Sequence, residues 1–433
     1  MTSKSPHHME PRSDPSKSER PSPGAWPILL MLMLVYSFSW MDRFLLVILI
    51  DPISKDLNVS NTAMGLLTGF ASSLLYSLAG FPIARLADRG SRITIVSMAV
   101  GIWSSLTAAI GLAHSLFTLA AARLGIAVAS AGCSPAAYSL IADLFPPRRR
   151  GTAIAIYSLG ISIGTWAGLS LGGFAADRLG WRNAFLVMGM PGFVLAIALF
   201  ALVREPKRGR FEGGNGEALR EYAFKDALRF LLTNRGFMGI ALGFDFISCA
   251  ASAFENWVPT YLIRAHGLSA TEVGSISGFF QGLTGIAGAL LFGILSDYLA
   301  RRDVRWYLWI PMTSAAVAGP LILLFFMLPK NDAYICYFFI ELAVSGYSAP
   351  LFAASQMLLP PRLRAFGMAT ILFVLNVIGT GTGTFITGWL SDVIAAPTPG
   401  GSLSTAIMSM QSLALVGMTG LFFAVRSLRQ ARQ

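Results

Sequence analysis

The segment ARLADRGSR at residues 84–92 has a second version later in the chain, GILSDYLARR at residues 293–302. Both copies lie between two long apolar segments, and in both an aspartate, Asp88 or Asp297, stands close to arginines. The distance between the two aspartates along the chain is 209 residues. A polar turn that recurs between apolar segments suggests that the chain contains a duplicated unit.

A second landmark repeats at nearly the same displacement. PPRRR at residues 146–150 returns as PPRLR at residues 360–364, and 214 residues separate Pro146 from Pro360. Two independent landmarks with almost equal offsets predict two related halves, each with basic turns at matching places.

The composition places these halves in a membrane. Of the 433 residues, 54% are hydrophobic and 13% are charged, and the mean hydropathy is +0.62. Soluble proteins carry about 25% charged residues, so a soluble multidomain enzyme is excluded. Twelve helices of about 20 residues would use about 240 residues. The predicted spans are 26–50, 62–84, 93–111, 116–142, 152–176, 183–203, 236–263, 271–295, 305–328, 333–358, 365–390 and 404–426.

The largest polar interruption, residues 204–235, divides these spans six and six. It includes a charged, amphipathic stretch near 217–233, as expected of a linker between two bundles. The predicted domains are a disordered cytoplasmic tail at 1–25, an amino-terminal six-helix bundle at 26–203, a cytoplasmic linker with an amphipathic helix at 204–235, a carboxy-terminal six-helix bundle at 236–426 and a cytoplasmic tail at 427–433.

The basic residues predict the topology. The two tails and the even-numbered loops together contain 26 Lys and Arg residues, whereas the odd-numbered loops contain five. Loops rich in Lys and Arg stay in the cytoplasm, so both termini are predicted to be cytoplasmic in a multi-pass protein of the cell (inner) membrane. The charges are scattered between apolar segments, so we expect no nucleic-acid partner.

No cofactor or metal is expected. Cys133, Cys249 and Cys336 lie far apart in apolar segments, and no histidine falls inside a span, which argues against a zinc site or a disulfide framework. The hydrolase pattern GxSxG occurs at 160–164 and 168–172, but inside an apolar helix and without a histidine partner. An ATP-binding Gly-Lys-Ser/Thr sequence is absent. We therefore expect a transporter rather than an enzyme, a channel or a scaffold.

The duplicated six-helix unit resembles the major facilitator superfamily, whose signature loop usually has a glycine where Ala84 stands. More narrowly, a set of motifs spread over about residues 37–310 is similar to the spinster family. These motifs are Met41-Asp42-Arg43-Phe44, Ile50-Asp51-Pro52-Ile53, Gly65 to Phe70, Ala131 to Ala137, Asp143 to Pro146, Trp257-Val258-Pro259 and Ala300 to Asp303.

This resemblance implies the major facilitator fold and alternating-access transport of an amphiphilic anion, such as a lysophospholipid or a sphingosine-phosphate-like lipid, with proton coupling as one option. The bilayer, the amphiphile and protons would then be the partners of a monomer. The alternative within transporters is a small organic anion, such as a carboxylate or a sugar phosphate.

Charges inside the spans are candidate functional groups, because burial in hydrocarbon is costly. Asp42 in span one and Arg123 in span four lie at similar depths in the outer half, so they can pair. The functional interpretation is a protonation and headgroup site, in which neutral Asp42 releases the Arg123 guanidinium for an anion. The alternative is a structural ion pair. Arg43 points about 100° away from Asp42 around the helix.

Ser130, two turns beyond Arg123, occupies the position where the spinster pattern has a glutamate implicated in proton coupling. Serine does not titrate, so Asp42 acts alone, another acid substitutes, or coupling is absent. Glu255 follows Asp42 by 213 residues, the repeat offset, and is the preferred substitute. Asp245 and Glu341 are further candidates, with structural roles as the alternative for all three.

The turns at the cytoplasmic ends predict a gate. Aspartates beside arginines at matching places can lock the bundles together when the protein opens outward, whereas topology signals alone explain the arginines but not the aspartates. The predicted gate residues are Asp88, Arg89, Arg92, Asp143, Arg149, Asp297 and Arg301.

Overall fold

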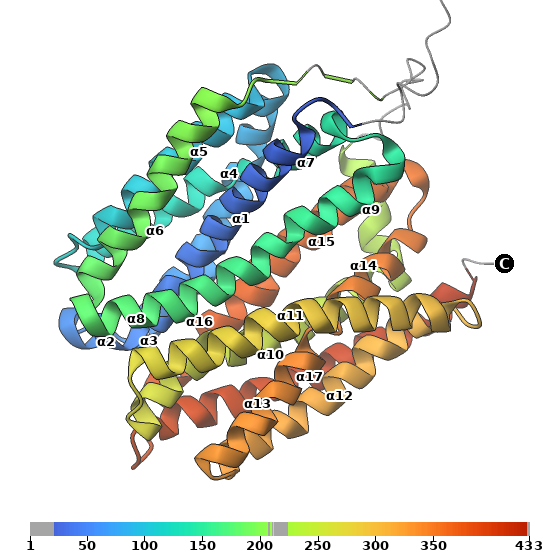
Figure 1. Ribbon diagram of the computed structural model, residues 1–433. Helices are drawn as coiled ribbons and strands as arrows, with labels where there is room; N and C mark the ends of the chain where they lie inside the picture. Colours follow the sequence, from blue (N-terminus) through green and yellow to red (C-terminus); the bar gives the residue numbers. More distant parts are fainter. Residues whose placement is uncertain (1–20, 207, 210, 212–223, 431–433) are drawn as a thin grey trace, which may run out of the picture.

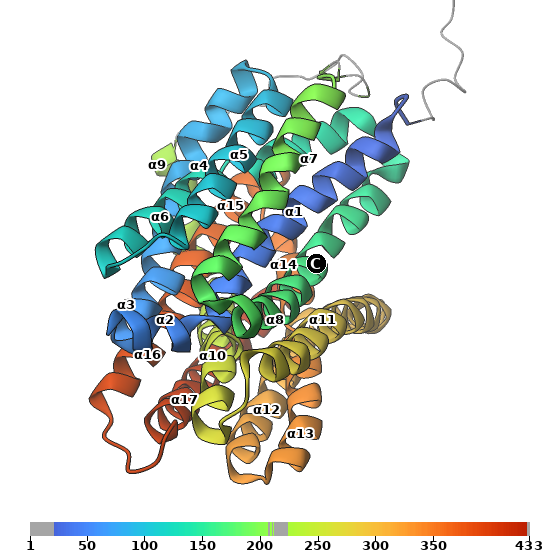
Figure 2. The same ribbon diagram turned by 60° about the vertical axis from the view of Figure 1, so that its left-hand side comes forward.

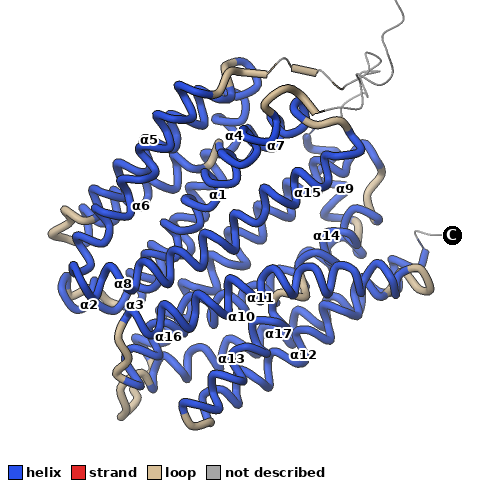
Figure 3. Tube along the Cα trace, in the orientation of Figure 1, coloured by secondary structure: helices blue, strands red, loops and turns tan. Residues whose placement is uncertain are grey.

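The computed structural model describes residues 21–206, 208, 209, 211 and 224–430. Within these residues every regular element is a helix (Figure 3). Twenty residues of the predicted amino-terminal tail and much of the linker lie outside this part. Of the predicted linker helix, the described portion is α9 (Phe224–Thr233).

The first half of the chain forms one helical bundle, and serine caps start two of its helices. The Ser91 and Ser115 side chains accept hydrogen bonds from backbone N–H groups that lack a partner in the first turn. The elements are α1 (Ala25–Ile48), α2 (Ile50–Leu57), α3 (Asn61–Gly65), the π-helix η2 (Leu66–Phe70), α4 (Ala71–Arg89), α5 (Arg92–Ile110), α6 (Leu116–Ser130), α7 (Cys133–Leu144) and α8 (Pro147–Leu202).

The α8 segment contains two membrane spans. Its 56 residues would measure about 84 Å as one straight helix, more than twice the hydrocarbon core. Gly180 interrupts it with a φ of +79°, a left-handed conformation open to glycine. Eleven helical stretches are long and apolar enough to cross a membrane. Because α8 counts twice, the prediction of twelve spans is confirmed.

The second half repeats this architecture. Its elements are α10 (Arg235–His266), α11 (Ala270–Ala300), α12 (Trp306–Met327), α13 (Lys330–Val344), α14 (Ser348–Met357), the 3-10 helix η3 (Pro361–Leu363), α15 (Arg364–Val374), the π-helix η4 (Leu375–Thr382), α16 (Gly383–Val393) and α17 (Gly401–Gln430). The last helix therefore continues into the predicted carboxy-terminal tail.

The internal repeat extends to side-chain packing. A Cβ atom at Gly132, between α6 and α7, would collide with Ile83, and one at Gly346, between α13 and α14, would collide with Phe292. These two contacts are related by the offsets of 214 and 209 residues that the basic turns show. The prediction of two pseudo-symmetric bundles is confirmed.

The glycines of the GxSxG matches have a packing role. Gly160, Gly164 and Gly168 of α8 face the backbone of α1, where added Cβ atoms would lie 2.2–2.8 Å from carbonyl oxygens of Met33, Ser37 and Met41. Small residues on one face allow this close helix contact. In Figures 1 and 2, α1 runs beside α8 through the amino-terminal bundle.

Candidate functional site

Three helices of the amino-terminal bundle bring buried polar groups together. Asp42 of α1 is 5% exposed and accepts a 3.0 Å hydrogen bond from the Thr107 hydroxyl of α5. Arg123 of α6 is 7% exposed, its charge interacts with that of Asp42, and its Nε atom has no hydrogen-bond partner among the described residues. The two side chains are neighbours, as expected, but no ion pair within 4.0 Å joins them in the described chain.

Arg43 connects this group to the carboxy-terminal bundle. Its guanidinium lies 5.3 Å from the centre of the Trp40 ring, and its charge interacts with Glu255 of α10. The charges of Arg43 and Arg123 also act on one another. Two guanidinium groups from α1 and α6 therefore share one buried region at the interface between the bundles.

The carboxy-terminal bundle contributes acids to the same interface. Glu255 is half-buried, and its charge interacts with Glu341 of α13, which is 3% exposed. The Gln281 amide of α11 lies between them, donating to the Glu255 carbonyl oxygen at 3.2 Å and to the Tyr337 hydroxyl at 3.1 Å. Asp245, about three turns earlier in α10, is 3% exposed and has one carboxylate oxygen without a partner.

Ser130 ends α6 on the amino-terminal side of the interface. Its hydroxyl donates to the Ile126 and Ala127 carbonyl oxygens of its own helix at 2.9 and 3.2 Å. The hydroxyl is therefore satisfied locally, and a bound substrate would have to compete with the helix for it.

Ion pairs and helix caps join the two bundles at the end predicted to face away from the cytoplasm, here called the outer end. Asp51 of α2 binds Arg264 of α10 at 2.7 Å, and Arg264 also donates to Asn61 at 3.0 Å. Asp392 of α16 accepts hydrogen bonds from the backbone N–H groups of Asn61 and Thr62. Sequence analysis missed these groups, because spacing along the chain does not reveal that Asp51 and Arg264 meet.

Close helix contacts between the bundles are confined to the outer half. Along α8 and α11 they run from Gly173 against Ala270 to Ser162 against Gly285, and along η2 and η4 they include Gly69 against Gly381. Figures 1 and 2 show α2, α3 and α16 gathered at one end of the molecule, away from the start of α1. The outer end is closed in this conformation.

At the opposite end, the predicted gate residue Arg92 lies in a buried cluster within the amino-terminal half. It binds Asp143 at 2.5 Å and Glu205, in the segment after α8, at 2.7 Å. The remaining Asp143 oxygen accepts a 2.9 Å hydrogen bond from the Gly209 N–H group. Arg92 and Asp143 thus fasten the start of the linker to the bundle, and Glu205 is a partner that sequence analysis did not single out.

Glu205 gives this cluster a pH dependence. Partial burial opposes ionisation, yet hydrogen bonds from the Ile93 N–H group, Arg92 and Ser91 lower the pKa of Glu205 below its ordinary value. A lowered folded-state pKa contributes stability above the unfolded pKa of about 4.3, and this stability is lost as the pH falls through the folded value.

We therefore expect Glu205→Gln to lower the melting temperature at pH 7. The deficit should shrink as the pH falls below about 4, where wild-type Glu205 is itself protonated. Thermal unfolding of the detergent-solubilised protein between pH 3 and 8 measures both effects. A deficit that is equal at all pH values would contradict this role for the carboxylate.

The other predicted gate residues do not form pairs between the bundles in this conformation. Asp297 accepts a 2.8 Å hydrogen bond from the Tyr307 hydroxyl of its own bundle. Arg89, Arg149 and Arg301 are exposed, and the side chain of Asp88 lies outside the described part. With the outer end closed, a lock at the cytoplasmic end is not expected to be engaged.

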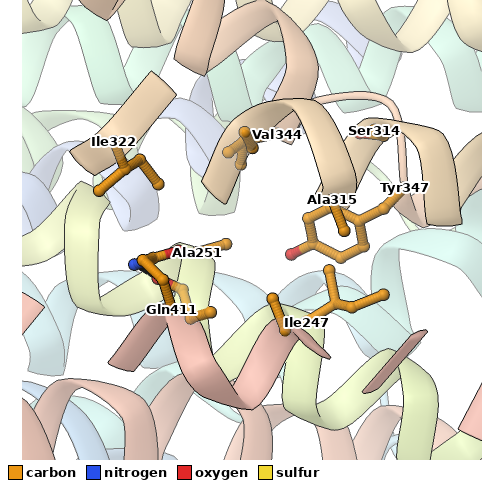
Figure 4. A pocket seen from close by; sticks show the side chains of 11 residues that line it. Ile247, Ala251, Ser314, Ala315, Ile322, Val344, Tyr347 and Gln411 are labelled. Atoms are coloured by element: carbon orange, nitrogen blue, oxygen red, sulfur yellow. Dashed lines mark hydrogen bonds between the residues drawn. The ribbon is translucent and has the colours of Figure 1, made fainter. Parts of the chain in front are cut away.

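The enclosed cavities are too small or too apolar to hold a charged headgroup. One of about 20 Å³ lies between α10, α12, α13 and α17, where Figure 4 shows Tyr347 and Gln411 among aliphatic side chains. That volume suffices for about one water molecule. A second hollow of about 240 Å³ between α1 and α8 has an apolar lining that includes Leu34, Phe38 and Met188. The charged interface is therefore the candidate site.

Twelve spans in two related bundles, with buried charges where the bundles meet, define a membrane transporter of the alternating-access type. The chain belongs to the Major Facilitator Superfamily, whose sequence model matches residues 32–384. Within it the protein is of the spinster type. A solved bacterial homologue of the human lysosomal transporter Spinster, in an inward-facing and unoccupied conformation, matches with a TM-score of 0.86 and 27% identity over 95% of this chain and 98% of that chain.

Curated relatives support this assignment. A Mycolicibacterium smegmatis protein named MFS-type efflux pump is 35% identical over 91% of both chains. A Bacillus subtilis protein named as a probable galactarate/D-glucarate transporter is 30% identical over 64% of this chain and 66% of its own length. The sphingosine-1-phosphate transporter SPNS2 of Danio rerio is 26% identical over 82% of this chain and 73% of its own length. The protein is a multi-pass transporter of the inner membrane.

Proposed function

We propose that the protein moves an amphiphilic anion, such as a lysophospholipid or a sphingosine-phosphate-like lipid, across the membrane by alternating access with proton coupling. The observation that carries this proposal is Arg123, a buried guanidinium with a free Nε atom beside a second arginine, Arg43. Two neighbouring positive charges in a buried region favour an anionic ligand, and guanidinium groups bind phosphate in a bidentate manner.

The proposed cycle uses Asp42 as the switch for binding. Ionised Asp42 attracts Arg123 and competes with the substrate anion, whereas protonated Asp42 leaves the guanidinium to the headgroup. Glu255 and Arg43 complete the proposed site from the two sides of the interface, with Ser130 at its edge. When the cytoplasmic ends close, the proposed gate residues meet and both termini remain on the cytoplasmic side.

The similarity to SPNS2 supports a lipid substrate, and the name of the M. smegmatis relative supports export. A second candidate is a small organic anion, which the similarity to a galactarate/D-glucarate transporter favours. Both substrates are anions, so the arginines alone do not separate them. The test is transport by reconstituted vesicles, with lysophosphatidylglycerol and D-glucarate as competing substrates.

We expect Asp42→Asn to flatten the pH dependence of transport, because the amide mimics the protonated acid at every pH. The measurement is the initial rate of lysophosphatidylglycerol transport by proteoliposomes between pH 5 and 8. Asp245→Asn is the matched control, since Asp245 is equally buried but has no contact with Arg123 in the described chain. If the Asp42→Asn profile matched that of the wild type, Asp42 would not be the coupling acid.

A further inference from the structure

Two acids of the carboxy-terminal bundle form one electrostatic unit. Glu255 of α10 and Glu341 of α13 interact with each other, and the Tyr337 hydroxyl lies within the reach of both charges. Tyr347 also faces Glu255, and the Gln281 amide bridges the Glu255 backbone to Tyr337. Among the described groups that face this pair, Arg43 supplies the positive charge, and it belongs to the other bundle.

Hydrogen-bond acceptors outnumber donors around the pair. The Oε1 atoms of Glu341 and Gln281 are both buried and lack a hydrogen-bond partner among the described residues. Two such acceptors beside two carboxyl groups indicate a missing donor. A proton on Glu341 would supply that donor, and a bound proton is the smallest ligand that meets the need.

The charge balance gives the same answer. Two ionised carboxylates in one buried site repel each other, so a single cation stabilises only one of them. With Arg43 nearby, a neutral site requires one proton shared by the two acids. If Arg43 withdrew, a neutral site would require two protons.

Arg43 withdraws when the outer ends separate. It lies on α1 and Glu255 on α10, and the described close contacts between the bundles lie in the outer half. An outward-facing conformation must break those contacts and move α1 away from α10. The pair formed by Asp42 and Arg123, by contrast, lies within one bundle and keeps its spacing as the bundles rock.

We propose that Glu341 keeps a proton throughout the cycle, while Glu255 binds one proton each time the outer end opens and loses it to the competing charge of Arg43 each time that end closes. One proton then crosses the membrane per cycle at a site distinct from Asp42. This inference rests on the alternating-access motion of the proposed function, but not on the identity of the substrate.

The test measures the outer distance without any substrate. Spin labels at Asn183 of α8 and Asp332 of α13, both exposed at outer helix ends, report the separation of the bundles by double electron–electron resonance. The buried cysteines Cys133, Cys249 and Cys336 are replaced by alanine in this background. Full-length protein in lipid nanodiscs is measured between pH 5 and 9.

For one proton, the ratio of outward-facing to inward-facing molecules rises by up to about tenfold for each unit fall in pH. Glu341→Gln should keep this slope, because the amide mimics a permanently protonated acid. Glu255→Gln and Arg43→Gln should each reduce it to near zero. Asp245→Asn, an acid-to-amide change in the same helix as Glu255, should keep the wild-type slope.

A wild-type slope in Glu255→Gln, a lost slope in Glu341→Gln, or a response to sodium at constant pH would each overturn the proposal. Failure to bind or move lysophosphatidylglycerol would count against the proposed substrate alone, because the distance measurement contains none.

Discussion

Arg123→Ala abolishes the thermal stabilisation that lysophosphatidylglycerol gives to the purified protein. The wild-type guanidinium is buried with a free Nε atom, so the anionic headgroup finds in it a strong, poorly hydrated donor. Removing one partner of a buried charged hydrogen bond costs about 2–5 kcal/mol, which weakens binding by about 30-fold or more. The measurement is the melting temperature of the detergent-solubilised protein over a titration of the lipid.

Arg182→Ala is the matched control. Arg182 is also an arginine of the amino-terminal bundle, but it pairs with Asp56 at the outer surface at 2.6 Å, far along the chain from the interface. Its alanine variant should keep the full ligand-induced shift. An Arg123→Ala protein that was stabilised as strongly as the wild type would show that the headgroup binds elsewhere.

Gly274→Ala shifts the transporter toward the outward-facing state. Gly274 of α11 packs against α8, and an added Cβ atom would lie 2.2 Å from the Leu169 carbonyl oxygen, a backbone atom that cannot rotate away. Overpacking of this kind costs about 1–3 kcal/mol. The contact exists only with the outer end closed, so the population ratio should change by about 5- to 150-fold.

The distance between outer labels at Asn183 and Asp332 measures this shift at constant pH. Gly293→Ala is the control, because Gly293 lies on the same helix and an added Cβ atom there meets nothing within 4 Å. Equal distance distributions in the wild type and Gly274→Ala would contradict the view that this seam closes the outer end.

Much of the fold could be predicted because the membrane imposes it. Apolar runs of fixed length and the repeated turns at Asp88 and Asp297 define twelve spans in two halves before any contact is known. The ends of spans were harder to place. Breaks such as Gly180 and the π-helix η4 depend on local backbone geometry, to which hydropathy is insensitive.

The site could be predicted only in part. Costly charges inside spans identified Asp42, Arg123 and Glu255, and the structure brings them to one interface. Which groups touch was beyond the sequence, because partners such as Asp51 and Arg264 come from different bundles, and contacts between bundles change with conformation. The repeat offset located Glu255 but did not reveal that its cation is Arg43.

The most direct test of the central claim is transport by proteoliposomes that contain the purified protein. Fluorescent lysophosphatidylglycerol in one leaflet is followed by back-extraction with albumin, in parallel with radiolabelled D-glucarate, under an imposed pH gradient. The account predicts lipid translocation that depends on Arg123 and on the gradient. Translocation of D-glucarate without any movement of the lipid, or lipid movement that Arg123→Ala leaves unchanged, would contradict it.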